Sequence, residues 1–167
     1  MKRWYAVYAQ PRNEMLASEH LSRQGFDVYL PRYMKRRSHA RRVDVVPAPL
    51  FPRYLFVFFD TNERGWSVIR STRGVIDIVR NGPDLVPVSS GIIDEIKRRE
   101  DEQGHVVLGE YLNLKPGAKL RIDTGPFADC EAIFSSKRDD ERVMALLSLL
   151  GRKVVVSIPI HDLSIAD

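Results

Sequence analysis

The spacing of apolar residues divides the first hundred positions into alternating strands and helices. An aromatic and β-branched run at residues 4–9 predicts a strand that ends at Pro11, because proline has no N–H for a β ladder. A helix is expected from Asn13 to Gln24, with Gly25 just past its end. The further expected elements are strands at 26–34, 42–46, 50–59 and 75–79, a short helix at about 62–70, and a helix from Ser89 or Ser90 through Arg99. The first seven elements, βαβββαβ, predict an α+β sandwich.

The strand expected at residues 50–59 is apolar on both sides. Tyr54, Phe56 and Phe58 point to one face of a sheet, and the alternating Leu55, Val57 and Phe59 point to the other. Helices of the same domain can cover one of these faces. The second face also needs a cover, and an exposed aromatic groove of this kind indicates a protein partner.

A polar stretch, Lys97–Gly104, has no apolar residue to pack and predicts a boundary between two domains. Beyond it, short strands at 119–122, 131–134 and 154–158 with a turn at Gly125-Pro126 predict a small β-barrel. Residues 140–150 fit two structures. Local propensity favours a helix with an apolar stripe that stops at Gly151, whereas closure of a barrel requires a strand.

Charge is unevenly distributed, although the net charge of the 167 residues is only +4. Residues 1–53 carry +7, residues 54–100 carry 0 and residues 101–167 carry −3. Six basic side chains crowd into positions 32–42, in an expected hairpin with a charged, mobile tip. The sequence supports two interpretations of this basic run almost equally, a solvated loop and a contact with nucleic acid.

The sequence contains no recognisable catalytic or metal-binding pattern. Its four histidines are scattered, Cys130 is the single cysteine, and there is neither a Gly-rich phosphate loop nor a nucleophile elbow. We therefore expect a protein without catalytic activity, metal or cofactor. The longest apolar run, Tyr54–Phe59, is far too short to cross a bilayer, so a cytoplasmic protein is expected.

The sequence resembles the NusG-type transcription elongation factors, and within them the specialised RfaH-like antitermination branch. The resemblance is carried by Trp4-Tyr5, Gln24-Gly25-Phe26, Pro49-Leu50-Phe51-Pro52-Arg53-Tyr54-Leu55-Phe56-Val57, Ser71-Thr72-Arg73-Gly74-Val75, and Gly117 with Gly125-Pro126-Phe127. It implies an N-terminal NGN domain at 1–100, a linker at 101–114 and a C-terminal KOW domain at 115–167, the KOW domain being a small SH3-like β-barrel able to refold as a helical hairpin.

The resemblance also implies three binding surfaces. Docking on the clamp helices and gate loop of bacterial RNA polymerase maps to Tyr8, Phe51, Pro52, Tyr54 and Phe56, with the gate-loop contact near Gly65, Trp66 and Ser67. Contacts with the non-template DNA strand map to Gln10, His20, Arg23, Gln24, Arg73 and Gly74. Binding of ribosomal protein S10 or the termination factor Rho maps to Leu149, Leu150, Gly151 and Arg152.

The sequence departs from the RfaH pattern in three respects. Residues 65–67 lack its His-Thr-Thr triplet, and Gln10 replaces a basic residue. The ion pair that locks its closed, helical form needs an acid where this chain has Ala48, although Arg142 stands at the partner position. We therefore expect the open, barrel form of the KOW domain rather than the helical form.

The expected function is that of a monomeric antitermination factor acting on specialised operons, because His20, Arg23 and Gln24 occur together. Two alternatives stay open. One is a general NusG factor that couples polymerase to Rho and the ribosome. The other is an RNA-binding, ribosome-associated module, since a barrel and a basic hairpin suffice for that role.

Overall fold

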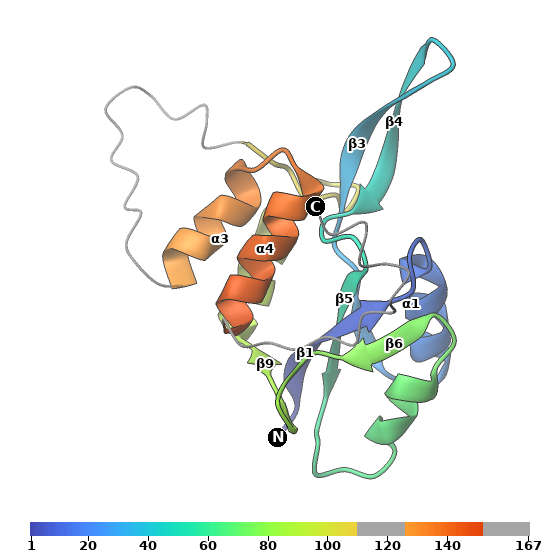
Figure 1. The fold of residues 1–167 in the computed structure, drawn as a ribbon, viewed down its shortest axis with the longest axis vertical. Helices are drawn as coiled ribbons and strands as arrows, with labels where there is room; N and C mark the ends of the chain where they lie inside the picture. The colour runs from blue at the N-terminus through green and yellow to red at the C-terminus, as the bar shows by residue number, and fades with distance from the viewer. Residues whose placement is uncertain (110–125, 152–167) are drawn as a thin grey trace.

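A five-stranded antiparallel sheet forms the centre of the molecule (Figure 1). The computed structural model describes residues 1–109 and 126–151, with only the backbone at 126–129. The strand order is β2-β5-β1-β6, and β9 pairs with β1 beside Trp4 and Tyr5. These strands are β1 (Arg3–Ala9), β2 (Asp27–Tyr29), β5 (Tyr54–Phe59), β6 (Val75–Ile78) and β9 (Pro87–Val88).

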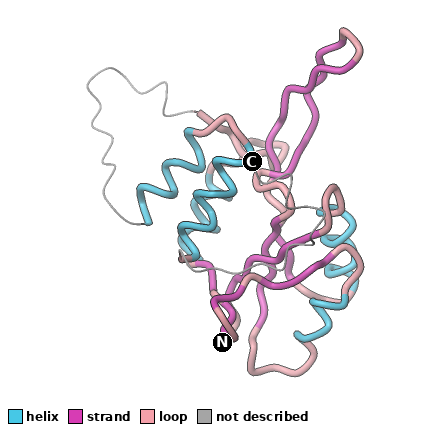
Figure 2. Tube along the Cα trace, in the orientation of Figure 1, coloured by secondary structure: helices cyan, strands magenta, loops and turns pink. Residues whose placement is uncertain are grey.

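Helical segments cover both faces of this sheet (Figures 1 and 2). Leu55, Val57 and Phe59 pack with α1 (Glu14–Arg23) and the 3₁₀ helix η1 (Trp66–Ser71). Tyr54 and Phe56 pack on the opposite face, as the alternation along the strand predicts. This second face is covered by α2 (Ser90–Arg98), α3 (Pro126–Ser135) and α4 (Asp139–Leu150).

Proline residues account for two differences from the expected strands. The strand expected at 26–34 is divided into β2 and β3 (Arg32–His39) next to Pro31. The strand expected at 50–59 begins only at Tyr54, after Pro52 and after Arg53, whose φ is 74°. The helix from Ser89 is confirmed, and the Ser89 hydroxyl accepts a hydrogen bond from the Gly91 N–H at 3.2 Å.

The basic run forms strands rather than a loop. We call the antiparallel pair β3 and β4 (Arg42–Pro49) the basic ribbon; it projects from the body of the molecule (Figure 1). Its two-residue turn places Ala40 at φ 48° and Arg41 at φ 68°. Left-handed backbone costs a non-glycine residue roughly 1–2 kcal/mol. A second short pair, β7 (Arg80–Asn81) and β8 (Asp84–Leu85), follows β6.

The expectation of an open barrel is wrong for residues 126–150. These residues form two packed helices, α3 and α4, which we call the helical hairpin. The strand expected at 131–134 is part of α3, and the ambiguous segment 140–150 is part of α4. Three acids, Asp139, Asp140 and Glu141, begin α4 where the helix dipole favours negative charge, and Gly151 ends it. The strands expected at 119–122 and 154–158 lie outside the described residues.

The segment after α2 turns back against the body. Val106 is 3% exposed, pairs with Glu100, and donates its N–H to the carbonyl of Arg32 at 2.7 Å. The Gly109 N–H reaches the carbonyl of Phe134 in α3 at 2.9 Å. Among the described residues, no helix has the length and apolar character needed to cross a membrane.

Gly74, in the loop before β6, packs closely against Ala17 of α1. Replacing Gly74 with alanine tests this contact. Its φ is +90°, and an added Cβ would lie 3.0 Å from the backbone nitrogen of Ala17. Gly25 has a similar φ, +92°, with nothing within 4 Å. We expect Gly25→Ala to lower the free energy of unfolding by about 1–2 kcal/mol, and Gly74→Ala to lower it by about 1–3 kcal/mol more. Urea unfolding measures both; equal losses would contradict the packing role of Gly74.

Candidate functional site

Aromatic rings gather on one face of the sheet at the site expected to bind polymerase. The rings of Tyr8 and Tyr54 are 5.1 Å apart, and those of Phe51 and Phe56 meet edge to face at 5.9 Å. The guanidinium of Arg53 lies 4.3 Å from the centroid of the Tyr8 ring. We call this surface the aromatic groove; its residues are Tyr8, Phe51, Tyr54 and Phe56. Pro52, also expected here, is half-buried in the turn before β5.

The helical hairpin covers the aromatic groove. Phe51 and Phe56 are fully buried, and Tyr8 and Tyr54 are 4% and 5% exposed. They share one hydrophobic cluster with residues of the two helices, namely Ile133, Phe134, Ala145, Leu146 and Leu150. Burial raises the pKa of Tyr54, so its phenol is neutral. The cover that the second face of the sheet requires is therefore supplied by α2 together with a distant segment of the same chain, the helical hairpin.

A fully buried arginine joins the helical hairpin to the loop before β5. The Arg142 Nε donates to the carbonyl of Leu50 at 2.9 Å, and Nη1 donates to the carbonyl of Ser136 at 2.9 Å. Nη2 pairs with the carboxylate of Asp139, three residues earlier in α4. The guanidinium also lies 4.4 Å from the ring centroid of Tyr33 in β3. Carbonyls, a carboxylate and a ring thus compensate for burial of the charge.

Asp139 extends this contact to the base of the basic ribbon. It accepts hydrogen bonds from the hydroxyl of Tyr33 at 2.5 Å and from Nζ of Lys35 at 2.6 Å. Burial, and then the hydrogen bond to Asp139, raise the pKa of Tyr33 to about 12, so the hydroxyl donates at neutral pH. We call Asp139, Arg142, Tyr33 and Lys35 the clamp.

The sequence did not indicate the clamp. It pointed to position 48 for the acid that pairs with Arg142, but Ala48 lies opposite Tyr33 in the basic ribbon and the acid is Asp139. The spacing of Asp139 and Arg142 on a helix was a usable signal for that pair. The contacts of Asp139 with Tyr33 and Lys35 span more than a hundred residues and had no local signal.

The residues expected to contact DNA lie together where α1 meets the loop before β6. The Gln10 N–H donates to the carbonyl of Gly74 at 2.8 Å, and the Gln24 side chain donates to the hydroxyl of Thr72 at 2.9 Å. Arg23 and Arg73 are exposed, and His20 is half-buried. Thr72 was not among the expected residues; it positions Gln24.

The other two expected surfaces are partly described. Trp66 stacks on Phe59 with their centroids 5.7 Å apart, while Gly65 and Ser67 are exposed. These three residues lie at the start of η1, on the face of the sheet away from the aromatic groove. Leu149, Leu150 and Gly151 form the end of α4, and Leu150 is buried against the groove. Arg152 lies outside the described residues.

Comparison with known proteins identifies the family. Residues 2–97 match the family described as "Transcription termination factor nusG". The chain belongs to the NusG family. Within residues 1–109 and 126–151, no three His, Cys, Asp or Glu side chains are grouped so that they could hold a metal ion.

Relatives named NusG align with this chain over different fractions of their own length. "Transcription termination/antitermination protein NusG" of Deinococcus radiodurans is 29% identical over 126 residues, which cover 68% of this chain and 66% of that protein. The protein of the same name in Escherichia coli K12 is 26% identical over 175 residues, covering 94% and 92%. This chain spans less than two thirds of the relatives from Deinococcus, Streptomyces galbus and Synechocystis.

A solved structure is also similar to this NusG-family chain. It is titled "Domain interaction in Thermotoga maritima NusG" and is 23% identical, with a TM-score of 0.41. The match covers 72% of this chain and 69% of that one.

Removing the Asp139 carboxylate should loosen the helical hairpin. Asp139→Ala deletes the acceptor shared by Tyr33, Lys35 and Arg142, which costs about 2 kcal/mol after discounting the exposed Lys35 pair. Amide hydrogen exchange in α3 and α4 should then be faster by about 30-fold.

Asp140→Ala is the matched control for this substitution. Asp140 also lies in the first turn of α4, where its side chain pairs with Arg138 and accepts the Glu141 N–H at 3.0 Å, both of them neighbours in the chain. This variant should lose only local contacts and a helix-dipole contribution that solvent screens, so amide exchange in α3 and α4 should stay close to that of the unsubstituted chain. Equal exchange rates in the two variants would contradict the clamp.

Proposed function

We propose that this chain is a non-catalytic transcription elongation and antitermination factor that docks on the clamp helices of RNA polymerase through the aromatic groove. The observation that carries the proposal is a ring-lined groove whose cover is two helices from the far end of the chain. A partner that offers an apolar helical surface can replace those helices with similar contacts. Membership of the NusG family supports polymerase as this partner.

The closed arrangement supports the specialised, RfaH-like branch of the family. The resemblance to that branch implies that a helical form of the KOW domain covers the polymerase-binding groove. Here the helical hairpin lies on the groove and the clamp holds it there. The α4 segment has apolar residues on both faces when it is arranged as a strand. On release we expect it to join a KOW barrel that presents Leu149–Arg152 to ribosomal protein S10 or Rho.

The two remaining surfaces are assigned to other parts of a transcribing complex. Gln10, His20, Arg23, Gln24, Arg73 and Gly74 form the face assigned to the non-template DNA strand. Guanidinium, imidazole and carboxamide groups match both phosphates and base edges. The gate-loop contact is assigned to Gly65, Trp66 and Ser67, which are separated from the aromatic groove by the sheet.

Tyr54→Ala tests docking on polymerase. Truncating an aromatic residue at the centre of an interface typically costs 2 kcal/mol or more, so we expect binding to core polymerase to weaken by about 30-fold. Co-purification and a quantitative binding assay measure the effect, and circular dichroism confirms that the fold persists. Met15→Ala, which truncates an exposed apolar residue on α1, is the control and should bind normally.

Retention of polymerase binding by Tyr54→Ala would refute this docking surface. If neither the chain nor the variant bound polymerase, and both bound RNA equally, the ribosome-associated RNA-binding module would be the correct function.

Breaking the contacts of Asp139 that hold the helical hairpin closed should strengthen the binding of this chain to polymerase. Asp139→Ala raises the population in which the helical hairpin has left the groove, so the apparent Kd should fall by up to about 30-fold. Asp140→Ala should leave the Kd within about twofold of the unsubstituted chain. Unchanged binding in Asp139→Ala would contradict a groove that must be uncovered before docking.

Genome-wide occupancy distinguishes a specialised factor from a general one. A groove that is covered at rest should restrict recruitment, so chromatin immunoprecipitation should find the protein on a few operons. Occupancy that follows polymerase across most genes would support the general NusG role instead.

A further inference from the structure

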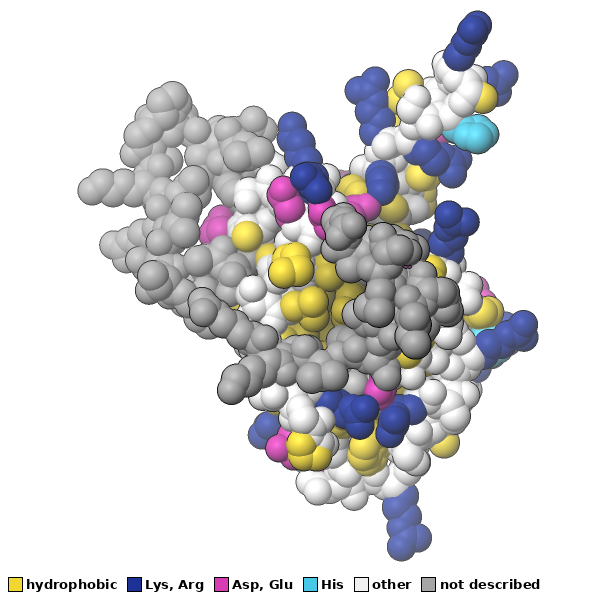
Figure 3. Space-filling view, viewed as in Figure 1, with side chains coloured by type: hydrophobic (Ala, Val, Ile, Leu, Met, Phe, Trp, Pro, Cys, Tyr) yellow, Lys and Arg dark blue, Asp and Glu magenta, His cyan; other side chains and the backbone are white. Residues whose placement is uncertain are grey.

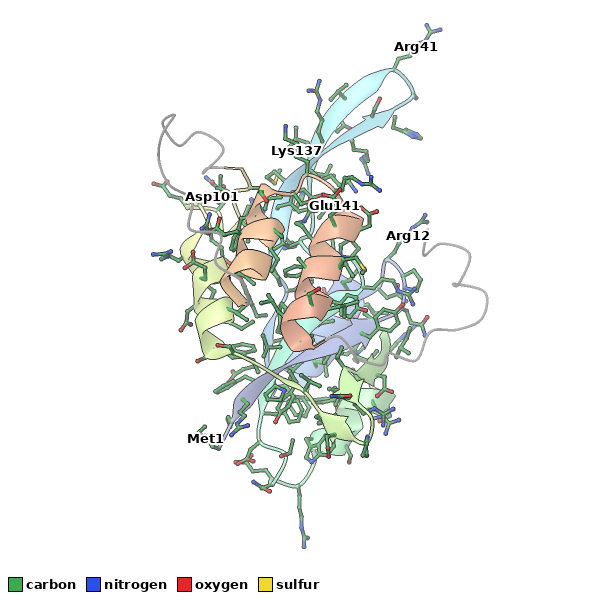
Figure 4. The ribbon with its side chains drawn as sticks, turned by 60° about the vertical axis from the view of Figure 1, so that its left-hand side comes forward. Met1, Arg12, Arg41, Asp101, Lys137 and Glu141 are labelled. Atoms are coloured by element: carbon green, nitrogen blue, oxygen red, sulfur yellow. The ribbon has the colours of Figure 1, made fainter. Side chains whose placement is uncertain are left out.

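The basic ribbon is a separate, strongly charged surface. Residues 34–47 carry the basic side chains Lys35, Arg36, Arg37, Arg41 and Arg42 and the single acid Asp44. All six are exposed, and the space-filling view shows Lys and Arg side chains along a projection from the body of the molecule (Figure 3). Arg41 is at its far end, pointing away from the rest of the chain (Figure 4).

Little of this charge is compensated within the described residues. Lys35 pairs with Asp139 of the clamp, and Arg37 lies 3.7 Å from Asp44 in a pair that is more than half exposed on both sides. These are the ribbon's ion pairs within the described part of the chain, and Arg36, Arg41 and Arg42 take part in neither. Cations held this close repel one another unless an external polyanion offsets them.

The turn of the ribbon keeps a charged residue, Arg41, in a backbone conformation that destabilises the turn locally. Both central residues, Ala40 and Arg41, have positive φ, a conformation for which Asn-Gly is the favoured pair. The chain instead places an arginine there. Val43 and Val45, exposed at 53% and 58%, are β-branched residues that keep an otherwise unsupported pair of strands extended.

We propose that the basic ribbon binds the phosphate backbone of duplex DNA. A two-stranded β-ribbon has the width to enter the major groove of B-form DNA, with basic side chains at its edges within reach of both phosphate strands. Residues 34–47 contain no Phe, Tyr or Trp on which the bases of a single strand could stack. The deep, narrow major groove of A-form RNA does not admit such a ribbon.

This contact is distinct from the face assigned to the non-template strand and adds a second DNA surface to the proposed function. Such binding is independent of base sequence and depends on salt, because phosphate neutralisation releases counterions. It is measured with DNA alone, so its failure leaves polymerase docking untouched.

Arg41→Gly in the full chain tests the proposal directly. It removes the positive charge at the tip of the ribbon and also relieves the strain of a non-glycine residue at positive φ. Its Kd for a random duplex of about 30 base pairs, measured by fluorescence anisotropy, should rise several-fold. The slope of log K against log salt should become shallower by about 0.9. Ala40→Gly relieves the same kind of strain with the charge kept, so its Kd should not change.

Thermal melting of both glycine variants should occur at or above the temperature of the unsubstituted chain, which separates lost binding from lost folding. A combined variant, Arg36→Ala with Arg37→Ala and Arg42→Ala, should reduce the salt slope by about 2.7. The matched control, Lys2→Ala with Arg3→Ala, removes exposed charge from the N-terminus and should leave most binding intact.

Three outcomes would overturn the proposal. The first is equal DNA affinity and salt slope in the ribbon variants and the unsubstituted chain. The second is loss of DNA binding only in Arg23→Ala with Arg73→Ala. The third is ribbon-dependent binding that is tighter for single-stranded RNA of equal length than for the duplex.

Discussion

The structure depends on a sheet with two apolar faces, both of which have to be shielded from water. In β5 the side chains alternate between Tyr54 and Phe56 on one face and Leu55 and Val57 on the other, and all four are buried. Helix α1 and η1, which are close in sequence to the strands, shield the second set. The first set is shielded by α2 and by helices that begin after residue 125. The location of the candidate polymerase site follows from this division.

The contact between the helical hairpin and the sheet is not a purely apolar core. Arg142 is fully buried at its edge, and its donors are satisfied by the carbonyls of Leu50 and Ser136 and by Asp139. A buried cation requires all of these acceptors at once, so small separations of the helices from the loop before β5 are costly. Apolar contacts alone tolerate sliding, because they have no direction. The clamp therefore gives the closed form a specific geometry.

Strand β3 takes part in both the clamp and the basic ribbon. Tyr33 and Lys35 at its start contact Asp139, while Arg36 and Arg37 further along are free of the helical hairpin. The two parts of the chain carry complementary charge, +7 over residues 1–53 and −3 over residues 101–167. One strand thus holds the acidic start of α4 at its base and presents cations to solvent towards its tip.

The sequence by itself indicated the sheet strands β1, β2, β5 and β6 but not the short β9, together with the alternation of Tyr54 and Phe56 against Leu55 and Val57 and the Ser89 cap. These features depend on local spacing and propensity. The ordered motifs of the sequence also indicated the family. The sequence also indicated that one face lacked a local cover. Only the tertiary structure decided what lies there. Residues 140–150 satisfy helix and strand patterns alike, and the choice between them rests on contacts with Phe51, Tyr54 and Leu50 far away in the chain. Such long-range contacts leave no periodic trace in either segment, which is why an open barrel was expected and a closed helical hairpin is found.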